Sequence, residues 1–267
     1  MSVTVSVIIA HYNAKSFIDE AIASVQAQTY RDWELIIVDD CSNDGSYEYL
    51  QDRATSIPLL SILRTDRNSG GPELPRFVGI AHAQGKYVAF LDADDYWEPG
   101  KLMAQMEAME RDGSNFVCTG RYDVDTRGTK SPGPSHRGTL SLRTLLRRNT
   151  ITTSSVLLDK TLLDGISPAS DPMLRYEDYY LWLCIFSQPD CRGQCLPDRW
   201  VDYRVLPDSR SRGHYVANLF SEVYVTCKFI ESSGRLDLIH TLITRLLWLK
   251  LKAWHHRFRS LTTGQKV

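Results

Sequence analysis

The chain has 267 residues, enough for one large hydrophobic core or two modest ones, and its 43% hydrophobic and 24% charged residues are ordinary for a globular protein. Its formal net charge of −1 provides no basic excess for neutralising phosphates, which argues against nucleic acid as a partner. No apolar run is long enough to span a bilayer, and the chain enters an apolar strand without a charged leader, so we expect a cytoplasmic protein.

Short apolar strands alternate with helical patterns over the first hundred residues. We predict strands at 3–9, 34–38, 59–64 and 87–91, with helices at 17–25, at 46–53 and after Pro72. This alternation implies right-handed βαβ units and a mostly parallel, doubly wound sheet. Ligands of such sheets collect at the carboxyl ends of the strands, where this chain places His11-Tyr12, Asp39-Asp40 and Asp92–Asp95.

The pattern becomes mixed after Asp95. We predict helices at 101–110 and 177–186, strands at 115–124, 151–158 and 199–205, and a loop rich in Gly, Pro and Ser at 127–137. These elements are expected to complete the same sheet, so that residues 1–214 form one domain. Helices at 215–231 and 236–259 then form a C-terminal helical extension over residues 215–267.

Three carboxylates follow the fourth predicted strand: Asp92, Asp94 and Asp95. Carboxylates gathered at a strand end repel one another, and a hard cation such as Mg²⁺ or Mn²⁺ relieves that repulsion while bridging to substrate phosphates. A solvated acidic turn is the alternative for an isolated Asp-x-Asp sequence. The position after a buried strand favours the metal site.

The end of the second strand carries another pair of carboxylates, Asp39 and Asp40. A carboxylate there can accept hydrogen bonds from a nucleobase N–H or from ribose hydroxyls, and Tyr12 offers an aromatic face for stacking a base. Helix capping by Ser42 or Asp44 explains the same segment equally well, and both interpretations can hold together.

Two further segments suggest catalysis. Glu177 and Asp178 begin a helix with an apolar side, where Asp178 suits a general base acting on an attacking hydroxyl; acids that complement the helix dipole are the alternative. Residues 203–214 are rich in Arg and Ser and suit a lid in which Arg210 or Arg212 contacts a diphosphate, although an exposed basic loop has the same composition.

These segments, in this order and at these separations, resemble glycosyltransferase family 2, a group of inverting enzymes with the GT-A fold. The similarity is carried by Val5–Asn13, Ser24–Thr29, Glu34–Ser46, Asn68–Pro72, Arg76 and Gly85–Asp95, and it returns at 151–158, 177–183 and 203–212.

The resemblance implies an α/β GT-A (Rossmann-like) fold with a mixed, mostly parallel sheet flanked by helices. Its nucleotide-sugar half would cover about residues 1–110 and its acceptor half about 111–214. The roles it implies are base recognition by Tyr12 and Asp40 with support from Asp39, nucleotide binding by Arg76 and Asp92, metal binding by Asp92 and Asp94, catalysis by Asp178, support from Glu177 and Asp95, and diphosphate contacts from Arg210, Arg212 and His214.

The implied reaction is a single displacement that uses Mn²⁺ or Mg²⁺. Asp178 takes a proton from an acceptor hydroxyl, which attacks the anomeric carbon of a nucleotide-sugar, with UDP the favoured carrier. The acceptor would be a saccharide or a lipid-linked saccharide, as in bacterial surface polysaccharide biosynthesis. A nucleotidyltransferase is the alternative enzyme, but the chain lacks a Gly-rich, lysine-bearing loop after its first strand, and a dehydrogenase is excluded by the lack of GxGxxG. A non-catalytic sugar-nucleotide-binding relative is the third hypothesis.

Two departures from the family pattern motivate that third hypothesis. Phe77 follows Arg76 where many relatives carry Asn, and Leu206 occupies the position of a histidine associated with the metal or diphosphate. A polar contact to the donor is therefore missing or replaced at each position.

The C-terminal segment raises a separate question. Its apolar residues recur at helical spacing, and every charged residue after Asp237 is basic. A basic amphipathic helix over 236–260 would make a peripheral contact with an anionic membrane, at the inner face of the cell membrane. Packing on the catalytic domain or on a dimer partner is the alternative. The six cysteines lack the spacing of a zinc site, so we expect free thiols in a reducing compartment.

Overall fold

Parallel strands and the helices between them build the first half of the molecule. The computed structural model describes residues 3–134, 136–169, 171, 173–174, 176–206, 215–241 and 243–244. The elements of the first half are β1 (Val5–His11), α1 (Ile18–Gln26), β2 (Trp33–Asp39), α2 (Ser46–Ala54), β3 (Leu60–Arg64), α3 (Glu73–His82) and β4 (Tyr87–Asp92). The strands lie in the order β3-β2-β1-β4 and are all parallel, which is the predicted doubly wound arrangement.

Strands of very different length extend the sheet in the second half, from the two-residue β5 to the twelve-residue β10. The elements are β5 (Tyr96–Trp97), α4 (Lys101–Asp112), β6 (Phe116–Val124), β7 (Lys130–Pro132), β8 (Gly138–Leu140), α5 (Leu142–Arg147), η1 (Thr153–Ser155), β9 (Leu157–Asp159), η2 (Lys160–Leu163), α6 (Glu177–Phe186), β10 (Gly193–Arg204), α7 (Tyr215–Ser233) and η4 (Leu236–Leu238). The sheet continues β4-β9-β6-β10-β5, with β9 antiparallel to both neighbours and β6 parallel to β10. The carboxyl ends of β1, β2, β3, β4, β6 and β10 therefore share one edge.

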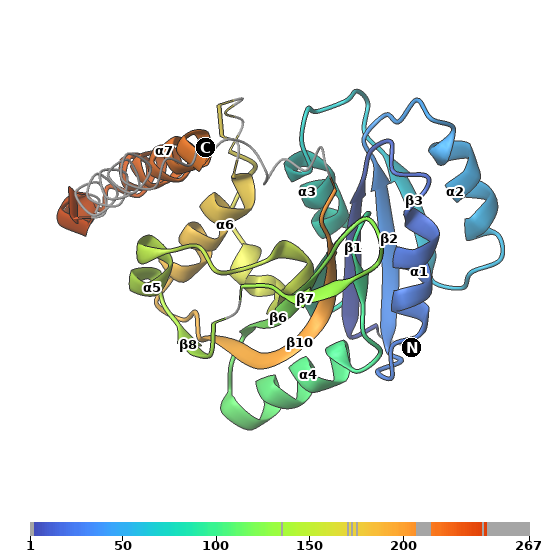
Figure 1. The fold of residues 1–267 in the computed structure, drawn as a ribbon, viewed down its shortest axis with the longest axis horizontal. Coiled ribbons are helices and arrows are strands. Elements are labelled where there is room, and N and C mark those ends of the chain that lie inside the picture. The colour runs from blue at the N-terminus through green and yellow to red at the C-terminus, as the bar shows by residue number, and fades with distance from the viewer. Residues whose placement is uncertain are drawn as a thin grey trace, which may run out of the picture.

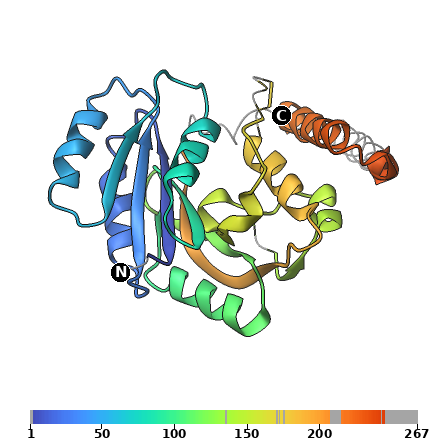
Figure 2. The same cartoon turned by 180° about the vertical axis from the view of Figure 1, so that it is seen from behind.

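Helices cover both faces of this sheet. Val5, Val7 and Ile9 of β1 point to one face, where they form a core with α1, α2 and α4. Ile8 points to the opposite face, where the core includes residues of α5, α6 and α7, with α3 packed against it. Figures 1 and 2 show α1 and α2 on one side of the strands and α3 on the other. Burial on both faces explains why the central strands β1, β2 and β4 are nearly continuous apolar runs rather than alternating patterns.

The helix α7 packs on α6, outside the sheet, at the end of the molecule away from α2 (Figure 1). Val225, Phe229 and Ile230 are buried in the same core as Trp182 of α6. The first helix of the predicted extension therefore contributes to the core of the main domain. Of the second predicted helix, the structure describes the turn η4 and helical residues 239–241 and 243–244, and the remainder lies outside the described residues.

Several predictions for the second half were wrong in detail. The predicted strand at 151–158 is instead the 3₁₀ turn η1 followed by the three-residue β9, because the Ser155 N–H donates to the Thr152 carbonyl at 2.9 Å and closes a turn. The predicted loop at 127–137 contains β7, which pairs with β6 across a turn held by the Asp125 carboxylate. The strand predicted at 199–205 begins at Gly193, and β5, β8 and α5 were not predicted.

A buried polar cluster joins β1, β2 and β4 at the edge opposite to their carboxyl ends. The Glu34 carboxylate accepts hydrogen bonds from the Ser6 hydroxyl at 2.6 Å and from the Gln84 N–H at 2.7 Å. Gly85 donates its N–H to the Ser6 hydroxyl, and a Cβ at Gly85 would lie 2.7 Å from the Ser6 backbone nitrogen. This close backbone approach requires glycine at the start of the Gly85–Asp95 motif.

All six cysteines are free thiols. Within the described part of the chain, no helix combines the length and the apolar character needed to cross a membrane.

Candidate active site

The carboxyl ends of β1 and β4, and the loops that follow β2 and β3, surround a pocket of about 580 Å³. Five of the predicted site residues line it together: Tyr12, Asp40, Arg76, Asp92 and Asp94. Tyr12 is 48% exposed, so its ring face is accessible for stacking. The volume falls within the range of roughly 300–1,000 Å³ that is usual for small-molecule sites.

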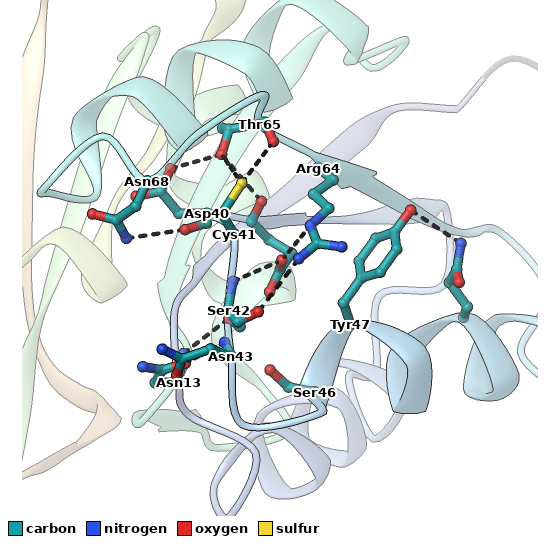
Figure 3. A network of polar contacts seen from close by, with 12 residues as sticks. Asn13, Asp40, Cys41, Ser42, Asn43, Ser46, Tyr47, Arg64, Thr65 and Asn68 are labelled. Carbon is teal, nitrogen blue, oxygen red and sulfur yellow. Dashed lines mark hydrogen bonds and ion pairs between the residues drawn. The ribbon is translucent and has the colours of Figure 1, made fainter.

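Asp40 is buried at the end of β2 and holds the loop that follows β3 (Figure 3). One carboxylate oxygen accepts a hydrogen bond from the Thr65 hydroxyl at 2.8 Å, and the other accepts from the N–H and the hydroxyl of Ser69, both at 2.9 Å. The Asn68 side chain donates to the Asp40 carbonyl at 3.0 Å. Asp40 therefore shapes the pocket wall, and base recognition by this carboxylate stays a prediction.

Asp39 is fully buried and does not line the pocket. One carboxylate oxygen accepts from the Ser42 N–H at 3.1 Å and lies 3.3 Å from the Arg64 guanidinium, while the other has no hydrogen-bond partner. The predicted capping of α2 by Ser42 or Asp44 is wrong, because Gly45 is the N-cap residue, with φ +76°, and its position carries no side-chain cap. Asp44 instead accepts from the Ser46 N–H at 3.0 Å. The structure thus gives Asp39 a supporting position.

The acidic cluster after β4 contains three differently held carboxylates. Asp92 lies 2.6 Å from the Arg76 guanidinium. Burial, and secondly the charge of Asp92, raises the pKa of Asp94 to about 6. Asp95 is buried and accepts from the Ser154 hydroxyl at 2.5 Å and from the Arg204 N–H at 3.0 Å. Burial and the neighbouring carboxylates raise the pKa of Asp95 well above its ordinary value, which suits a structural role.

The donor set for a cation is small. Among the described residues, no group of three or more His, Cys, Asp and Glu side chains can hold a metal ion by itself. Asp92 and Asp94 nevertheless provide carboxylate oxygens inside the pocket, and Mg²⁺ is often held by one or two carboxylates together with water and substrate phosphates. A cation would also stabilise the ionised form of Asp94, which burial disfavours.

Asp178 lies in the first turn of α6, beside the pocket and not in its lining. One carboxylate oxygen accepts from the Tyr179 N–H at 2.7 Å and the other from the Thr153 hydroxyl at 3.0 Å. Burial raises the pKa of Asp178, and the charge of Arg76 and these hydrogen bonds oppose the rise. A raised pKa in a carboxyl near a pocket is a property of general bases.

Arg76 links the two groups of carboxylates. Its guanidinium is buried, contacts Asp92 at 2.6 Å and lies 3.6 Å from Glu177. Burial alone would lower the pKa of Arg76, but Asp92, Glu177 and Asp178 outweigh it and raise the pKa. The arginine is therefore charged and holds the acidic cluster beside the first turn of α6.

The predicted lid residues Arg210, Arg212 and His214 lie outside the described residues. Leu206 lines the pocket with Asp94, so the position where the family resemblance implied a histidine presents a hydrocarbon side chain to the site. Arg204 was not predicted as a site residue; it donates to the Asp94 carbonyl at 2.9 Å and contacts Glu20 at 2.6 Å. Thr153 and Ser154 were not predicted either, and their hydroxyls inside a predicted apolar strand were the available signal.

Comparisons with known proteins agree with this arrangement. The sequence model described as Glycosyl transferase family 2 matches residues 6–163. The chain is 35% identical over 185 residues to UDP-Glc:alpha-D-GlcNAc-diphosphoundecaprenol beta-1,3-glucosyltransferase WfgD of Escherichia coli, with 68% of this chain and 69% of WfgD covered. It is 32% identical over 234 residues to the E. coli enzyme of the same description named WfaP, with 86% of each chain covered.

A solved structure supports the fold. The crystal structure of S. aureus TarS 1–349 in complex with UDP matches with a TM-score of 0.67 at 22% identity, covering 85% of this chain and 65% of that chain. The described sheet and its flanking helices are thus the GT-A fold of a glycosyltransferase. The chain belongs to glycosyl transferase family 2.

His11 provides a test of the buried part of this site. It lies opposite Asp39 in the β1–β2 register, is 1% exposed, and has no hydrogen-bond partner at either ring nitrogen. Burial lowers the pKa of His11 below its ordinary 6.5, against the opposing charges of Asp39 and Asp44. His11 therefore binds a proton near pH 6.5 in the unfolded chain and only at lower pH in the folded chain. The free energy of unfolding falls as the pH drops from about 6.5 toward the pKa of His11 in the folded chain.

We predict that His11→Leu removes this loss. Between pH 7.5 and pH 5 the free energy of unfolding of the wild type should fall further than that of the variant. The extra fall should be about 1.4 kcal/mol for each unit by which burial lowers the pKa of His11. Urea unfolding at both pH values measures it, with His82→Leu, at an exposed position of α3, as the control. A difference that is the same at both pH values contradicts the prediction.

Proposed function

We propose that this glycosyltransferase moves a sugar from UDP-sugar to a hydroxyl of a saccharide carried on a lipid diphosphate, with inversion at the anomeric carbon, in bacterial surface polysaccharide biosynthesis. The observation that carries the proposal is the single pocket lined by Tyr12, Asp40, Asp92 and Asp94, with Asp178 adjoining it. The names of WfgD and WfaP, which specify UDP-Glc and a GlcNAc-diphosphoundecaprenol acceptor, support this choice of donor and acceptor class.

In the proposed reaction the base and the leaving group lie on opposite sides of the sugar. Asp178 takes the proton of the acceptor hydroxyl, the hydroxyl oxygen bonds to the anomeric carbon, and the bond from that carbon to the diphosphate breaks. UDP leaves with the electron pair. Tyr12 stacks on the uracil, and Asp40 with the loop at Asn68 and Ser69 encloses the nucleoside.

We predict that the full-length chain with UDP-glucose, Mn²⁺ and a synthetic lipid diphosphate-linked α-GlcNAc extends the acceptor and releases UDP. Asp178→Asn should reduce kcat by about 100-fold or more, because general-base catalysis contributes at least that much. Asp198→Asn, at an exposed position of β10, is the matched control and should retain the activity of the wild type. Chromatography of both the lipid product and the released nucleotide measures the reaction.

The same experiment separates the alternatives. Transfer of the uridylyl group, with release of glucose 1-phosphate instead of UDP, would identify a nucleotidyltransferase. Binding of UDP without turnover above the Asp178→Asn background, over a panel of UDP-, GDP- and dTDP-sugars, would identify a non-catalytic binding protein and sink the proposed function.

We further propose that Asp92 and Asp94 would hold Mn²⁺ or Mg²⁺ when the donor is bound. The cation would supply positive charge to the leaving diphosphate. We predict that EDTA and Asp94→Asn each weaken UDP binding by about 10-fold or more in calorimetry, since both remove one part of the same charge-bridging contact. UDP affinity that is indifferent to EDTA and to Asp94→Asn contradicts the metal site.

We also propose a peripheral membrane contact through residues 236–260. Leu236, Ile239 and Ile243 are 68%, 41% and 51% exposed, so these apolar side chains are available for a surface other than the catalytic domain. The charged residues after Asp237 are all basic, which suits anionic lipid.

We predict that vesicles containing phosphatidylglycerol sediment the full-length chain, and that a chain ending at residue 235 stays in the supernatant. Vesicles of phosphatidylcholine alone are the control for charge. Equal sedimentation of the two chains would count against this contact.

A further inference from the structure

Two adjacent residues of η1 form hydrogen bonds with the two groups of carboxylates, the acidic cluster at the end of β4 and the first turn of α6. The Ser154 hydroxyl accepts a hydrogen bond from the Asp92 N–H at 3.1 Å and donates to Asp95 at 2.5 Å. The Thr153 hydroxyl donates to Asp178 at 3.0 Å. One turn of backbone therefore connects the acidic cluster after β4 with the first turn of α6.

This turn is held from outside the site. Thr153, Ser154 and Ser155 are 5%, 0% and 0% exposed. The Ser154 carbonyl accepts from the Trp97 indole N–H at 2.7 Å, and the Ser155 carbonyl accepts from the Gln105 amide at 2.9 Å. Because β5 and α4 fix the backbone in this way, the two hydroxyls are presented at a constant separation.

We propose that Thr153 and Ser154 are positioning residues: Thr153 orients the carboxylate of Asp178, Ser154 holds the acidic cluster, and the turn between them sets the distance from base to diphosphate site. The proposal rests on the proposed function, because it takes Asp178 as the base. It assigns the two hydroxyls different kinetic effects. Loss of the Thr153 hydroxyl should impair the chemical step, whereas loss of the Ser154 hydroxyl should impair binding of the donor diphosphate.

The charges around Asp178 give the Thr153 hydroxyl a second effect. Arg76 of α3, Asp92 of β4 and Glu177 of α6 are the charged groups near Asp178 in the described structure. Arg76 favours the ionised base and Asp92 opposes it. The hydrogen bond from Thr153 stabilises the ionised form, so its loss moves the ionisation of Asp178 to higher pH.

The test uses four full-length variants: Thr153→Val, Thr153→Ser, Ser154→Ala and Ser155→Ala. Ser155 is the matched control, because its buried hydroxyl donates to the Thr152 carbonyl in the same turn and not to a carboxylate of the site. Transfer from UDP-glucose with Mn²⁺ is followed between pH 5 and pH 9, UDP affinity is measured by calorimetry, and the unfolding temperature is recorded for each variant.

Thr153→Val should lower kcat by about 10-fold or more with UDP affinity within about twofold of the wild type, as for other residues that support a site residue. The acidic limb of its pH profile should move up by roughly half a unit or more, and Thr153→Ser should restore both the rate and the profile. Ser154→Ala should weaken UDP binding by about 10-fold, and Ser155→Ala should leave both quantities within about twofold.

If the wild type is active and Thr153→Val keeps its rate and pH profile, the positioning role of Thr153 is overturned while the proposed function stands. The proposal is also overturned if Thr153→Val and Ser155→Ala lower kcat equally and each loss follows the fall in unfolding temperature, because that result is expected of a damaged turn. If Thr153→Val does not fold, Thr153→Ala takes its place in the same comparison. A wild type that binds UDP and transfers nothing overturns the proposed function, and the role of Thr153 with it.

Discussion

Repulsion among carboxylates is the constraint on which this site depends. Asp92, Asp94, Asp95, Glu177 and Asp178 lie near the same edge of the sheet, three of them after one strand and two in the first turn of one helix. Ionised groups of one sign are costly in a partly dry environment unless donors or cations face them. The buried Arg76 contacts Asp92 and Glu177, one member of each group. The hydroxyls of Thr153 and Ser154 donate to Asp178 and Asp95.

The carboxylates differ in the hydrogen-bond donors and positive charges that face them, and they therefore differ in pKa. Asp95 is enclosed by Ser154 and the Arg204 backbone, and its raised pKa suits a permanent structural contact. Asp94 faces the pocket with a pKa of about 6, so a partner that arrives with the substrate would determine its charge. Asp178 is balanced between burial, which favours its acid form, and Arg76, which favours its base form.

The first half of the fold was predictable because each of its elements carries its own local signal. Solid apolar strands such as Val5–His11 and helices with periodic apolar residues such as Ile18–Gln26 need no distant partner to be recognised. The shared edge of parallel strands then placed Tyr12, Asp40, Asp92 and Asp94 in one pocket. The second half was predicted less well, since the turn at Thr153–Ser155 depends on partners in β4, β5, α4 and α6 that a local pattern does not contain.

The supporting contacts of the site were unpredictable for the same reason. The hydrogen bond between Thr153 and Asp178 spans 25 residues, and that between Asp95 and the Arg204 N–H spans 109. Charged side chains indicated the position of the candidate site, but the hydroxyl and backbone donors that hold them depend on the complete fold.

The short strand β9 is the only element of the described sheet that pairs with strands of both halves. It pairs with β4 over three residues and with β6 over two, and these pairs join the β1–β4 half of the sheet to the half that contains β6 and β10. The sheet itself thus offers few hydrogen bonds between the two halves, and the core that contains Phe90, Phe116 and Trp182 joins them as well. Substitutions in the loops around β6 and β10 that leave this core intact can therefore change the second half of the sheet without disturbing the pairing of β1, β2, β3 and β4.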